Sequence, residues 1–307
     1  MLDLIIIGGG PGGAAAGVYA ARKQLKTELV TKEWGGQSVV SPDIQNWIGT
    51  VSISGNDFSE ALKKHLEAYK GDTLTITPNS LVAKVEKKDD GFAITLDNGS
   101  TRETKAVLVT SGSTRRKLAV KGADIFEQKG LTYCASCDGP LFSGQDVVVI
   151  GGGNAGFETA AQLLAYTKSV TLLNRSAEFK ADPITTEKVL ANSHMTAIRN
   201  AEPTEVFGDT FVTGIRYKDT ATGEEKELAA GGVFVEIGLV PNTGFISDLV
   251  EADEYQRIKI DPWTQATSVP GIWAAGDCTN IKYHQNNISA GDAVKALEDI
   301  YVNLRTR

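Results

Sequence analysis

The chain has 307 residues and a formal net charge of −7, with 41% hydrophobic and 22% charged residues. This length suits about two domains of ordinary size, and the composition is typical of a globular protein. An acidic balance excludes the basic face that a nucleic-acid-binding protein needs. No run reaches the ~18 apolar residues that span a bilayer, and the first residues lack the features of a secretory signal. The sequence therefore predicts a cytoplasmic protein that binds neither nucleic acid nor membrane.

A strand, a glycine turn, a helix and a second strand open the chain. Residues 2–7 are an isoleucine-rich apolar run, residues 14–22 indicate a helix, and residues 27–31 indicate a strand. GGGPGG stands between the first strand and the helix. Glycines in such a turn let the chain approach a pyrophosphate, and the helix offers its N-terminal amides to that anion. The predicted contacts of this dinucleotide site are Gly8, Gly10, Pro11, Gly12 and Gly13.

The same pattern returns in the middle of the chain. Residues 146–150 predict a strand, GGGNAG follows at residues 151–156, a helix runs through Leu164, and residues 169–173 predict the next strand. Both copies have the strand before and the helix after that distinguish a dinucleotide turn from a plain glycine-rich turn. The second turn predicts contacts from Gly151, Gly153, Asn154 and Ala155. Two such turns imply two cofactors, such as a flavin and a nicotinamide.

Strands and helices alternate through the rest of the chain. Apolar stretches predict further strands at residues 92–96, 106–110, 231–237 and 271–275, and residues 290–304 predict an amphipathic helix. We expect an α/β fold with two Rossmann-like, three-layer dinucleotide-binding domains, one inserted in the other. The expected outer domain contains residues 1–113 and 244–307, and the expected inserted domain contains residues 114–243.

The residues at the end of the second strand of each glycine-turn unit are candidates to bind the nucleotide ribose. An acid is expected about 20 residues beyond the last glycine, where it holds the ribose hydroxyls. In the first copy this is Glu33, either as a ribose contact or as a solvent-facing side chain. In the second copy the corresponding position is Asn174, whose neutral side chain would not repel the 2′-phosphate of NADPH. The neighbours that can bind such a phosphate are Arg175, Ser176 and Lys180. They favour NADPH over NADH, although Glu178 counts against this.

Two cysteines stand at C-x-x-C spacing just before the second glycine turn. Cys134 and Cys137 can close a small disulfide ring, and one thiolate can be stabilised by its surroundings, so the pair predicts redox chemistry. A zinc half-site and an inert buried pair are the alternatives. Cys278 and the three histidines are scattered, so no metal site is predicted. Asp138 is either a proton donor to a departing thiolate or the cap of the turn at Gly139.

The motifs together resemble one family. Over essentially its whole length the chain is similar to the low-molecular-weight thioredoxin reductases. It looks even closer to the reductase half of the flavoprotein component of alkyl hydroperoxide reductase. The resemblance rests on both glycine turns and on GGQ at 35–37, NW at 46–47, TSG at 110–112, CASCDGP at 134–140, GLVPNT at 238–243 and AAGDC at 274–278.

This resemblance implies FAD in the outer domain and NAD(P)H in the inserted domain. The flavin contacts expected from it are Gly36, Gln37, Asn46, Gly112, Gly276, Asp277, His284 and Gln285. It also implies that Cys137 faces the flavin while Cys134 attacks the disulfide of a partner protein. Members of the family work as homodimers. They rotate their two domains between steps, so that nicotinamide and cysteine pair reach the flavin in turn.

Three features depart from the family pattern. The thioredoxin reductases usually carry His-Arg-Arg and a later Arg at the phosphate site, and the peroxide-linked flavoprotein carries an acid where Asn174 lies. His284 replaces an Arg or Lys, either to tune the flavin or as an ordinary hydrogen-bonding side chain. The peroxide-linked flavoprotein also has an N-terminal thioredoxin-like domain. This chain begins at the FAD motif, so we expect electrons to leave to a separate protein.

These observations predict an NAD(P)H-dependent FAD disulfide oxidoreductase of the thioredoxin reductase type. We expect electrons to pass through FAD and the Cys134–Cys137 disulfide to a thioredoxin- or glutaredoxin-like protein. The alternatives are an NADH-dependent reductase that feeds a peroxide-reducing system, a flavin oxidase, and a redox-sensing flavoprotein. The cysteine pair argues against an oxidase, and the second glycine turn argues against a sensor with a single ligand.

Overall fold

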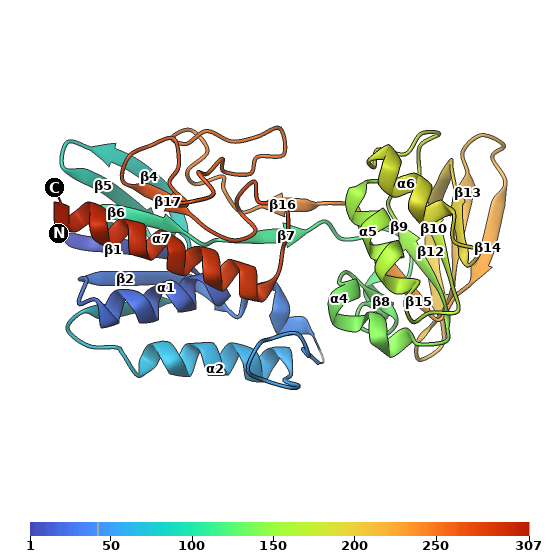
Figure 1. Ribbon diagram of the computed structural model, residues 1–307, viewed down its shortest axis with the longest axis horizontal. Coiled ribbons are helices and arrows are strands. Elements are labelled where there is room, and N and C mark those ends of the chain that lie inside the picture. The colour runs from blue at the N-terminus through green and yellow to red at the C-terminus, as the bar shows by residue number, and fades with distance from the viewer. Residues whose placement is uncertain (42, 307) are drawn as a thin grey trace. The chain divides into compact units, whose positions relative to one another are not determined.

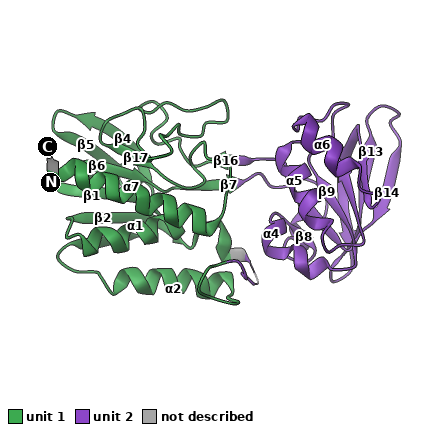
Figure 2. Cartoon of the chain, in the orientation of Figure 1, with its two compact units in different colours: residues 1–40, 47–114, 240–307 green, residues 41–46, 115–239 purple. Residues whose placement is uncertain are grey.

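The computed structural model describes residues 1–41 and 43–306 and divides the chain into two compact units. Unit 1 contains Met1–Val40, Trp47–Thr114 and Val240–Arg307, and unit 2 contains Ser41–Asn46 and Arg115–Leu239 (Figure 2). The chain passes between the units within two short strands, β7 (Ser113–Arg115) and β16 (Leu239–Pro241), which pair with each other. The main part of unit 2 is thus inserted into unit 1 along the sequence.

Unit 1 is built on a seven-stranded sheet (Figure 1). Its strands are β1 (Leu2–Gly9), β2 (Thr27–Trp34), β3 (Leu74–Pro78), β4 (Val82–Lys88), β5 (Gly91–Leu96), β6 (Thr101–Val109) and β17 (Ile272–Ala274). The order is β3-β2-β1-β6-β5-β4, with β17 also paired to β6. Strands β3, β2, β1, β6 and β17 are parallel, whereas β4 and β5 pair antiparallel with each other and β5 with β6. The chain reverses direction across the sheet between β1 and β6, which is where open α/β sheets bind ligands.

Three helices cover one face of this sheet. They are α1 (Pro11–Arg22), α2 (Gly55–Glu67) and α7 (Asn286–Thr306), and a 3-10 turn, η1 (Gly36–Val40), follows β2. Small side chains of α1 and α7, such as Ala16 and Ala293, pack with Leu4 and Leu108 of the sheet in one buried cluster. On the opposite face, sheet residues pack against the segment 245–258. Burial on both faces explains why β1 is an almost uninterrupted apolar run.

Unit 2 has three layers. A parallel sheet has the order β11-β10-β9-β15-β8, and an antiparallel sheet has the order β12-β13-β14. The strands are β8 (Leu131–Thr132), β9 (Asp146–Ile150), β10 (Ser169–Leu173), β11 (Met195–Ile198), β12 (Ala201–Gly208), β13 (Val212–Asp219), β14 (Glu225–Ala229) and β15 (Gly232–Val235). The switch point of the parallel sheet lies between β9 and β15.

Most helices of unit 2 lie on one side of the parallel sheet. They are α5 (Asn154–Leu163) and α6 (Pro183–Leu190), together with the short α4 (Ala135–Asp138) and the 3-10 turn η2 (Gly139–Phe142), which pack in the same cluster. The short α3 (Ala123–Phe126) packs on the other side. Phe157 and Leu163 of α5 are completely buried against Val149 and Leu172 of the sheet. The other side of the sheet packs against the antiparallel sheet through residues such as Ile215.

The predicted glycine-turn units are present with shifted ends. The first helix begins at Pro11 rather than at residue 14, because proline suits the first helical position even when glycines follow. The C-terminal helix begins at Asn286 rather than at residue 290. The antiparallel sheet of unit 2 was not predicted, since strands such as β14, EKELA, are largely exposed and lack an apolar run. The expected fold class, α/β with two Rossmann-like domains, is confirmed.

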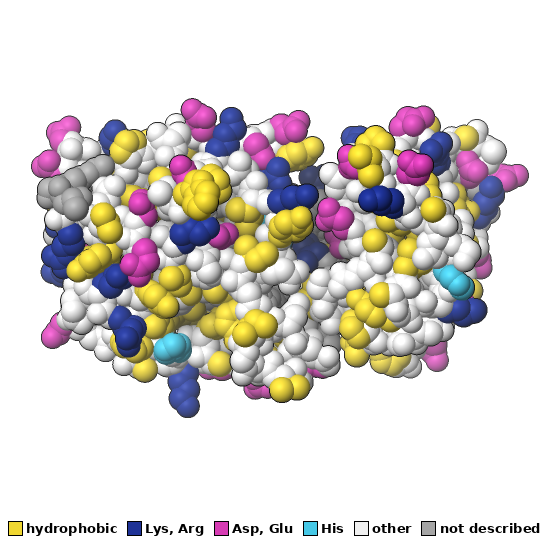
Figure 3. All heavy atoms as spheres, viewed as in Figure 1, with side chains coloured by type: hydrophobic (Ala, Val, Ile, Leu, Met, Phe, Trp, Pro, Cys, Tyr) yellow, Lys and Arg dark blue, Asp and Glu magenta, His cyan; other side chains and the backbone are white. Residues whose placement is uncertain are grey.

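Acidic and basic side chains are interspersed on the face of the molecule that Figure 3 shows. Some apolar side chains are well exposed, among them Ile48, Val51 and Trp263. Within the residues that the structure describes, no helix is both long enough and apolar enough to cross a membrane.

Candidate cofactor sites and redox-active disulfide

The first glycine turn joins β1 to α1 at the switch point of unit 1. Gly8 has a φ of +119°, and a Cβ atom on it would overlap the carbonyl oxygen of Thr110. A Cβ atom on Gly13 would overlap the carbonyl oxygen of Gly8. Because a larger residue fits neither place, glycine is what allows the strand to turn directly into a helix against β6.

The N-terminus of α1 is open toward a ligand. Gly10 is the N-cap residue, no side chain caps the helix, and its first turn contains no acid. A Cβ atom on Gly10 would meet only the Cα atom of Gly36, at 3.9 Å. Uncapped amides beside open backbone are the arrangement that a pyrophosphate binds. The turn therefore fits the pyrophosphate of a dinucleotide.

Three more segments of unit 1 meet at this turn. Gly36, beyond the end of β2, lies beside Gly10. A Cβ atom on Gly12 would lie 2.9 Å from the hydroxyl oxygen of Ser289, and one on Gly276 would lie 2.5 Å from the same oxygen. The structure thus brings the ends of β2 and β17 and the first turns of α7 to the predicted dinucleotide turn, although these segments are far apart in sequence.

Other predicted flavin contacts have defined partners. The side-chain amide of Gln37 donates to the carbonyl oxygen of Ser113 at 2.6 Å. The carbonyl oxygen of Gly112 accepts from the N–H of Asn242 at 3.0 Å. Glu33 lies near the end of β2 and is exposed, so its carboxylate is accessible to a ribose and equally to solvent.

Asp277 and His284 approach each other beyond the end of β17. Nδ1 of His284 lies 3.3 Å from Oδ1 of Asp277, which makes an ion pair when the imidazole is protonated. Gln285 follows, and its carbonyl oxygen accepts from the N–H of Ser289 at 2.9 Å. Asn46 falls in the segment 41–46, which is grouped with unit 2, and its expected contact with the flavin stays a prediction.

The second glycine turn repeats this construction at the switch point of unit 2. Cβ atoms on Gly151 and Gly156 would overlap the carbonyl oxygens of Glu236 and Gly151, respectively. Gly153 is the N-cap of α5 without a side-chain cap, and a Cβ atom on it would meet nothing within 4 Å. The turn fits a second pyrophosphate for the same reasons as the first.

Residues next to this turn shape the surrounding loops. Oδ1 of Asn154 accepts from the N–H of Asp182 at 2.7 Å, which ties the start of α5 to the start of α6. Ala155 occupies the first turn of α5. Asn174 is buried, and its Nδ2 donates to the carbonyl oxygens of Ser176 at 2.7 Å and Glu178 at 2.9 Å. Asn174 therefore holds the loop after β10 in shape.

The three candidate phosphate-binding side chains of that loop face solvent. Arg175, Ser176 and Lys180 are exposed. The N–H of Lys180 donates to the carbonyl oxygen of Gly152 at 2.8 Å, so the far end of the loop is attached to the glycine turn. The loop thus places these side chains at the carboxyl edge of the sheet, where a nucleotide ribose is expected.

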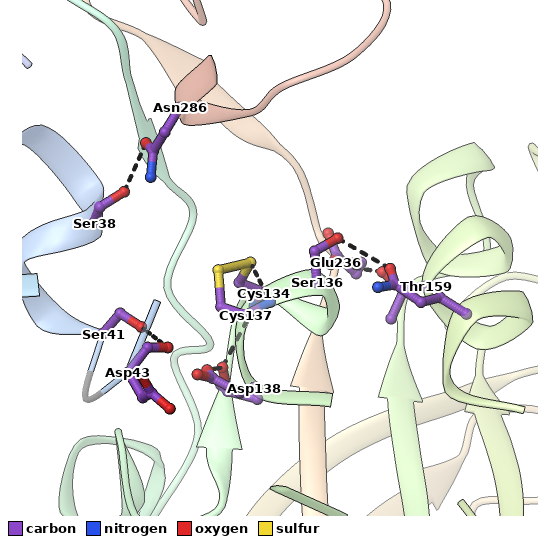
Figure 4. The surroundings of a disulfide bond; sticks show 12 residues. Ser38, Ser41, Asp43, Cys134, Ser136, Cys137, Asp138, Thr159, Glu236 and Asn286 are labelled. Carbon is purple, nitrogen blue, oxygen red and sulfur yellow. Dashed lines mark hydrogen bonds between the residues drawn. A yellow bond between two sulfur atoms is a disulfide. The ribbon is translucent and has the colours of Figure 1, made fainter. Parts of the chain in front are cut away.

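Cys134 and Cys137 form a disulfide at α4 (Figure 4). Cys134 is the N-cap residue of α4, and its Sγ accepts from the backbone N–H of Cys137 at 3.2 Å. Both cysteines are half-buried, which leaves the pair partly accessible. The third cysteine, Cys278, is fully buried, and burial raises the pKa of its thiol to about 11, so it stays protonated at neutral pH. Only the C-x-x-C pair is suited to thiol–disulfide exchange.

Asp138 is a buried carboxyl group directly after the disulfide. One carboxyl oxygen shares a hydrogen bond with the hydroxyl of Thr132, and the other has no partner among the described residues. Burial raises the pKa of Asp138, while the hydrogen bond with Thr132 and the charge of Arg115 lower it. Its side chain makes no capping hydrogen bond to η2, the role that the sequence left as an alternative. A carboxyl that holds its proton more readily is suited to protonate a departing thiolate.

Sequence reasoning missed several residues at these sites. Thr132 comes from β8 and has no motif of its own. Glu236 directly follows β15 at the switch point, and its Oε1 accepts from the hydroxyl of Thr159 at 2.9 Å (Figure 4). Burial raises the pKa of Glu236, partly offset by Arg115 and by Thr159. Arg199 follows β11 beside the loop that begins at Asn174. The glycine turn on β9 is the signal that would have directed attention to the neighbouring strand ends.

Comparisons with known proteins agree with the presence of two glycine turns and a disulfide. A family model described as pyridine nucleotide-disulphide oxidoreductase matches residues 2–291. The chain belongs to this family. It is 42% identical over 294 residues to the F subunit of alkyl hydroperoxide reductase from Staphylococcus aureus (strain MRSA252), covering 96% of this chain and 57% of that protein. It is 40% identical, with the same coverage, to a protein named NADH dehydrogenase from Bacillus subtilis (strain 168).

Among solved structures, thioredoxin reductase from Giardia duodenalis superposes with a TM-score of 0.93 at 31% identity, covering 99% of each chain. The resemblance noted in the sequence, to low-molecular-weight thioredoxin reductases and to the peroxide-linked flavoprotein, is thereby confirmed. The relatives imply a flavin and a pyridine nucleotide and place the chain among the disulfide oxidoreductases. The chain spans little more than half the length of the two curated relatives.

Proposed function

We propose that this protein transfers electrons from NADPH, through FAD and the Cys134–Cys137 disulfide, to a thioredoxin- or glutaredoxin-like protein. The observation that carries the proposal is a partly accessible C-x-x-C disulfide beside a buried carboxyl, Asp138, in a chain with two open dinucleotide turns. A disulfide, a proton donor and two cofactor sites are the parts that such electron transfer requires.

The proposed site for FAD is in unit 1 and the proposed site for NADPH is in unit 2. The amides of the first turn of α1 would hold the pyrophosphate of FAD, beside Gly36. By likeness to the family, Glu33 would contact the ribose, and Asp277 and Gln285 would contact the rest of the cofactor. The first turn of α5 would hold the pyrophosphate of NADPH. FAD held there would supply two-electron redox chemistry, linking oxidation of a reduced nicotinamide to reduction of a disulfide.

The cysteine pair then carries the electrons outward. Reduction breaks the S–S bond with two electrons and two protons, and Asp138 supplies a proton to the departing sulfur. The thiol of Cys134 then loses its proton, and the resulting thiolate attacks a sulfur of the partner's disulfide, forming a mixed disulfide and releasing one partner thiolate, which takes up a proton. Cys137 next attacks the Cys134 sulfur, which restores the Cys134–Cys137 disulfide and releases the second partner thiol.

Two features support this division of roles between the cysteines. The sulfur of Cys134 already accepts a hydrogen bond from the N–H of Cys137, which stabilises negative charge there. The same division holds in the family that the sequence resembles, with the second cysteine facing the flavin. We therefore assign the exchange with the partner to Cys134 and the exchange with the flavin to Cys137.

The preference for NADPH rests on the loop after β10. Arg175 and Lys180 are exposed and form no ion pair within the described residues, so both are available to a 2′-phosphate. The buried side chain at position 174 is an amide that would not repel a phosphate. A relative named NADH dehydrogenase makes NADH the alternative nucleotide.

A second candidate function is favoured by the identity of 42% to the F subunit of the staphylococcal alkyl hydroperoxide reductase. In this alternative the protein delivers electrons to a peroxide-reducing system, with NADH as the electron source. Action as a flavin oxidase or as a redox sensor is less well supported, because neither makes use of both the disulfide and the second dinucleotide turn. By likeness to the family, we propose a cytoplasmic homodimer.

The test is steady-state oxidation of NADPH and NADH by the purified protein with different acceptors. These are oxygen alone, a thioredoxin, a glutaredoxin and a cysteine-dependent peroxidase with peroxide. We expect rapid turnover only with the thioredoxin or the glutaredoxin as acceptor. This turnover should be lost in Cys134→Ser. Turnover with oxygen that Cys134→Ser leaves unchanged would identify an oxidase and contradict the proposal.

A further inference from the structure

Arg199 lies beside the candidate phosphate-binding loop on the neighbouring strand. Strands β10 and β11 are parallel, and Leu173 is paired with Ile198, so the residues that follow them, Asn174 and Arg199, leave the sheet side by side. The N–H of Asn174 donates to the carbonyl oxygen of Ile198 at 2.9 Å, and the N–H of Asn200 donates to the carbonyl oxygen of Ser176 at 3.2 Å. These hydrogen bonds fix the backbone on both sides of Arg199 against the loop.

The side chain of Arg199 is held by the same loop. Its guanidinium carbon lies 4.6 Å from the centroid of the Phe179 ring. Phe179 in turn packs edge-to-face on Phe157 of α5, with 5.1 Å between ring centroids. The guanidinium therefore rests on a ring that is anchored to the core of unit 2, so its position at the strand edge is restricted.

Three cations gather at this edge from two different strand ends. Arg175 and Lys180 come from the loop after β10, and Arg199 comes from the end of β11. Within the part of the chain that the structure describes, none of the three forms a salt bridge. Among the acids near them in sequence, Asp182 uses its carboxylate to cap α6, and the exposed Glu178 and Glu202 form no salt bridge with any of the three in the described part of the chain. The edge thus presents uncompensated positive charge to an anion.

We propose that Arg199 is a specificity-determining residue for NADPH, whose guanidinium binds the 2′-phosphate together with Arg175. This rests on the proposed nucleotide site at the second glycine turn. At the end of the second strand of a Rossmann unit the adenosine ribose is bound, which brings its 2′ position to this edge. Arginine is suited to the role because its planar fork binds two phosphate oxygens while its face stays stacked on Phe179.

The experiment measures equilibrium binding of NADP⁺ and of NAD⁺ to the oxidised flavoprotein by calorimetry, so that neither turnover nor a protein partner is needed. Arg199→Met keeps an apolar stem on the Phe179 ring but removes the charge, and Arg199→Lys keeps the charge but removes the fork. Lys168→Ala is the matched control, because Lys168 is an exposed cation of unit 2 paired with Asp146 before the start of β10.

We expect Arg199→Met to weaken NADP⁺ binding by about ten-fold or more while NAD⁺ binding is unchanged. Arg199→Lys should lie between the parent and Arg199→Met, and Lys168→Ala should match the parent. Equal weakening of both nucleotides would show that Arg199 stacks on the adenine or only packs the loop, and would overturn the inference. Unchanged binding of both in Arg199→Met would also overturn it. A parent that binds neither nucleotide would contradict the proposed nucleotide site itself.

Discussion

The backbone N–H of Cys137 donates a hydrogen bond to the sulfur of Cys134 at 3.2 Å, while the sulfur of Cys137 accepts none from the described residues. The two sulfurs of the disulfide are therefore not equivalent. A donor directed at one sulfur stabilises a thiolate there after reduction, so more of that cysteine is present as the reactive thiolate at neutral pH, and its sulfur is the better leaving group.

Replacement of either cysteine should separate the two roles. Cys137→Ser should form a lasting mixed disulfide with a thioredoxin-type partner through Cys134, since no second thiol is present to resolve it. Cys134→Ser should form none. Non-reducing intact-mass spectrometry after incubation of each reduced variant with the oxidised partner checks this. A mixed disulfide in Cys134→Ser and none in Cys137→Ser would reverse the assignment.

Asp138→Asn should slow electron transfer to the disulfide and raise the unfolding temperature at pH 8. Asn cannot donate a carboxyl proton, so transfer of electrons to the disulfide should slow by about 10²-fold. Burial raises the pKa of Asp138 in the folded state. Its favourable contribution to the free energy of unfolding is therefore fully present below the ordinary carboxyl pKa and is lost as the pH rises through the raised value. At pH 8 the neutral Asn should therefore unfold at a higher temperature than the parent.

The stability difference should shrink as pH falls toward the ordinary carboxyl pKa of 3.8, where the parent is also neutral. Thermal unfolding at several pH values, with rapid-mixing measurements of disulfide reduction, tests both halves. An Asn variant that is less stable at pH 8 and reduces its disulfide at the parent rate would return Asp138 to a purely structural role.

These same residues show which parts of the candidate site could be predicted from the sequence. The glycine turns were predictable because steric limits, such as the overlap between Gly13 and Gly8, demand glycine at fixed spacing. The cysteine pair was predictable because its chemistry depends on spacing along the chain. The partners of Asp138 were not, since Thr132 is brought to it by the pairing of β8 with β15.

The same reasoning explains why Arg199 was overlooked. Nothing in the local sequence connects it to Arg175, and only the parallel register between Leu173 and Ile198 places the two strand ends together. The role of Asn174 within its loop could not be predicted either. Its position in the motif predicts a nucleotide contact, which stays a prediction, and the structure adds that its Nδ2 donates to two carbonyl oxygens of its own loop.

The two N-cap glycines offer a reciprocal test of the cofactor sites. Gly10 and Gly153 both have extended backbone and open space around a Cβ atom, so Gly10→Ala and Gly153→Ala should fold normally. A methyl group there obstructs the approach of a pyrophosphate. Gly10→Ala should therefore lose FAD but keep binding of NADP⁺, and Gly153→Ala should do the reverse. Flavin content and NADP⁺ calorimetry measure the two effects, and a variant that loses both would contradict separate sites.

Arg175→Ala should change the choice between nucleotides. A charge-assisted contact with phosphate contributes roughly 1.5–3 kcal/mol, so its loss should raise the KM for NADPH by about ten-fold or more. The KM for NADH should hardly move, because NADH has no 2′-phosphate. Steady-state kinetics with both nucleotides provide the measurement. A parent that prefers NADH would show that Arg175 is an ordinary surface charge.

The central claim is that electrons from the nicotinamide reach the Cys134–Cys137 disulfide. Anaerobic titration of the oxidised flavoprotein with NADPH, followed by flavin absorbance and by counting free thiols, tests it most directly. Because a disulfide is a two-electron couple, the parent should take up one two-electron equivalent more than a variant with both cysteines replaced by serine, and should gain the corresponding thiols. Equal uptake by parent and variant, with no new thiols in the parent, would contradict the account.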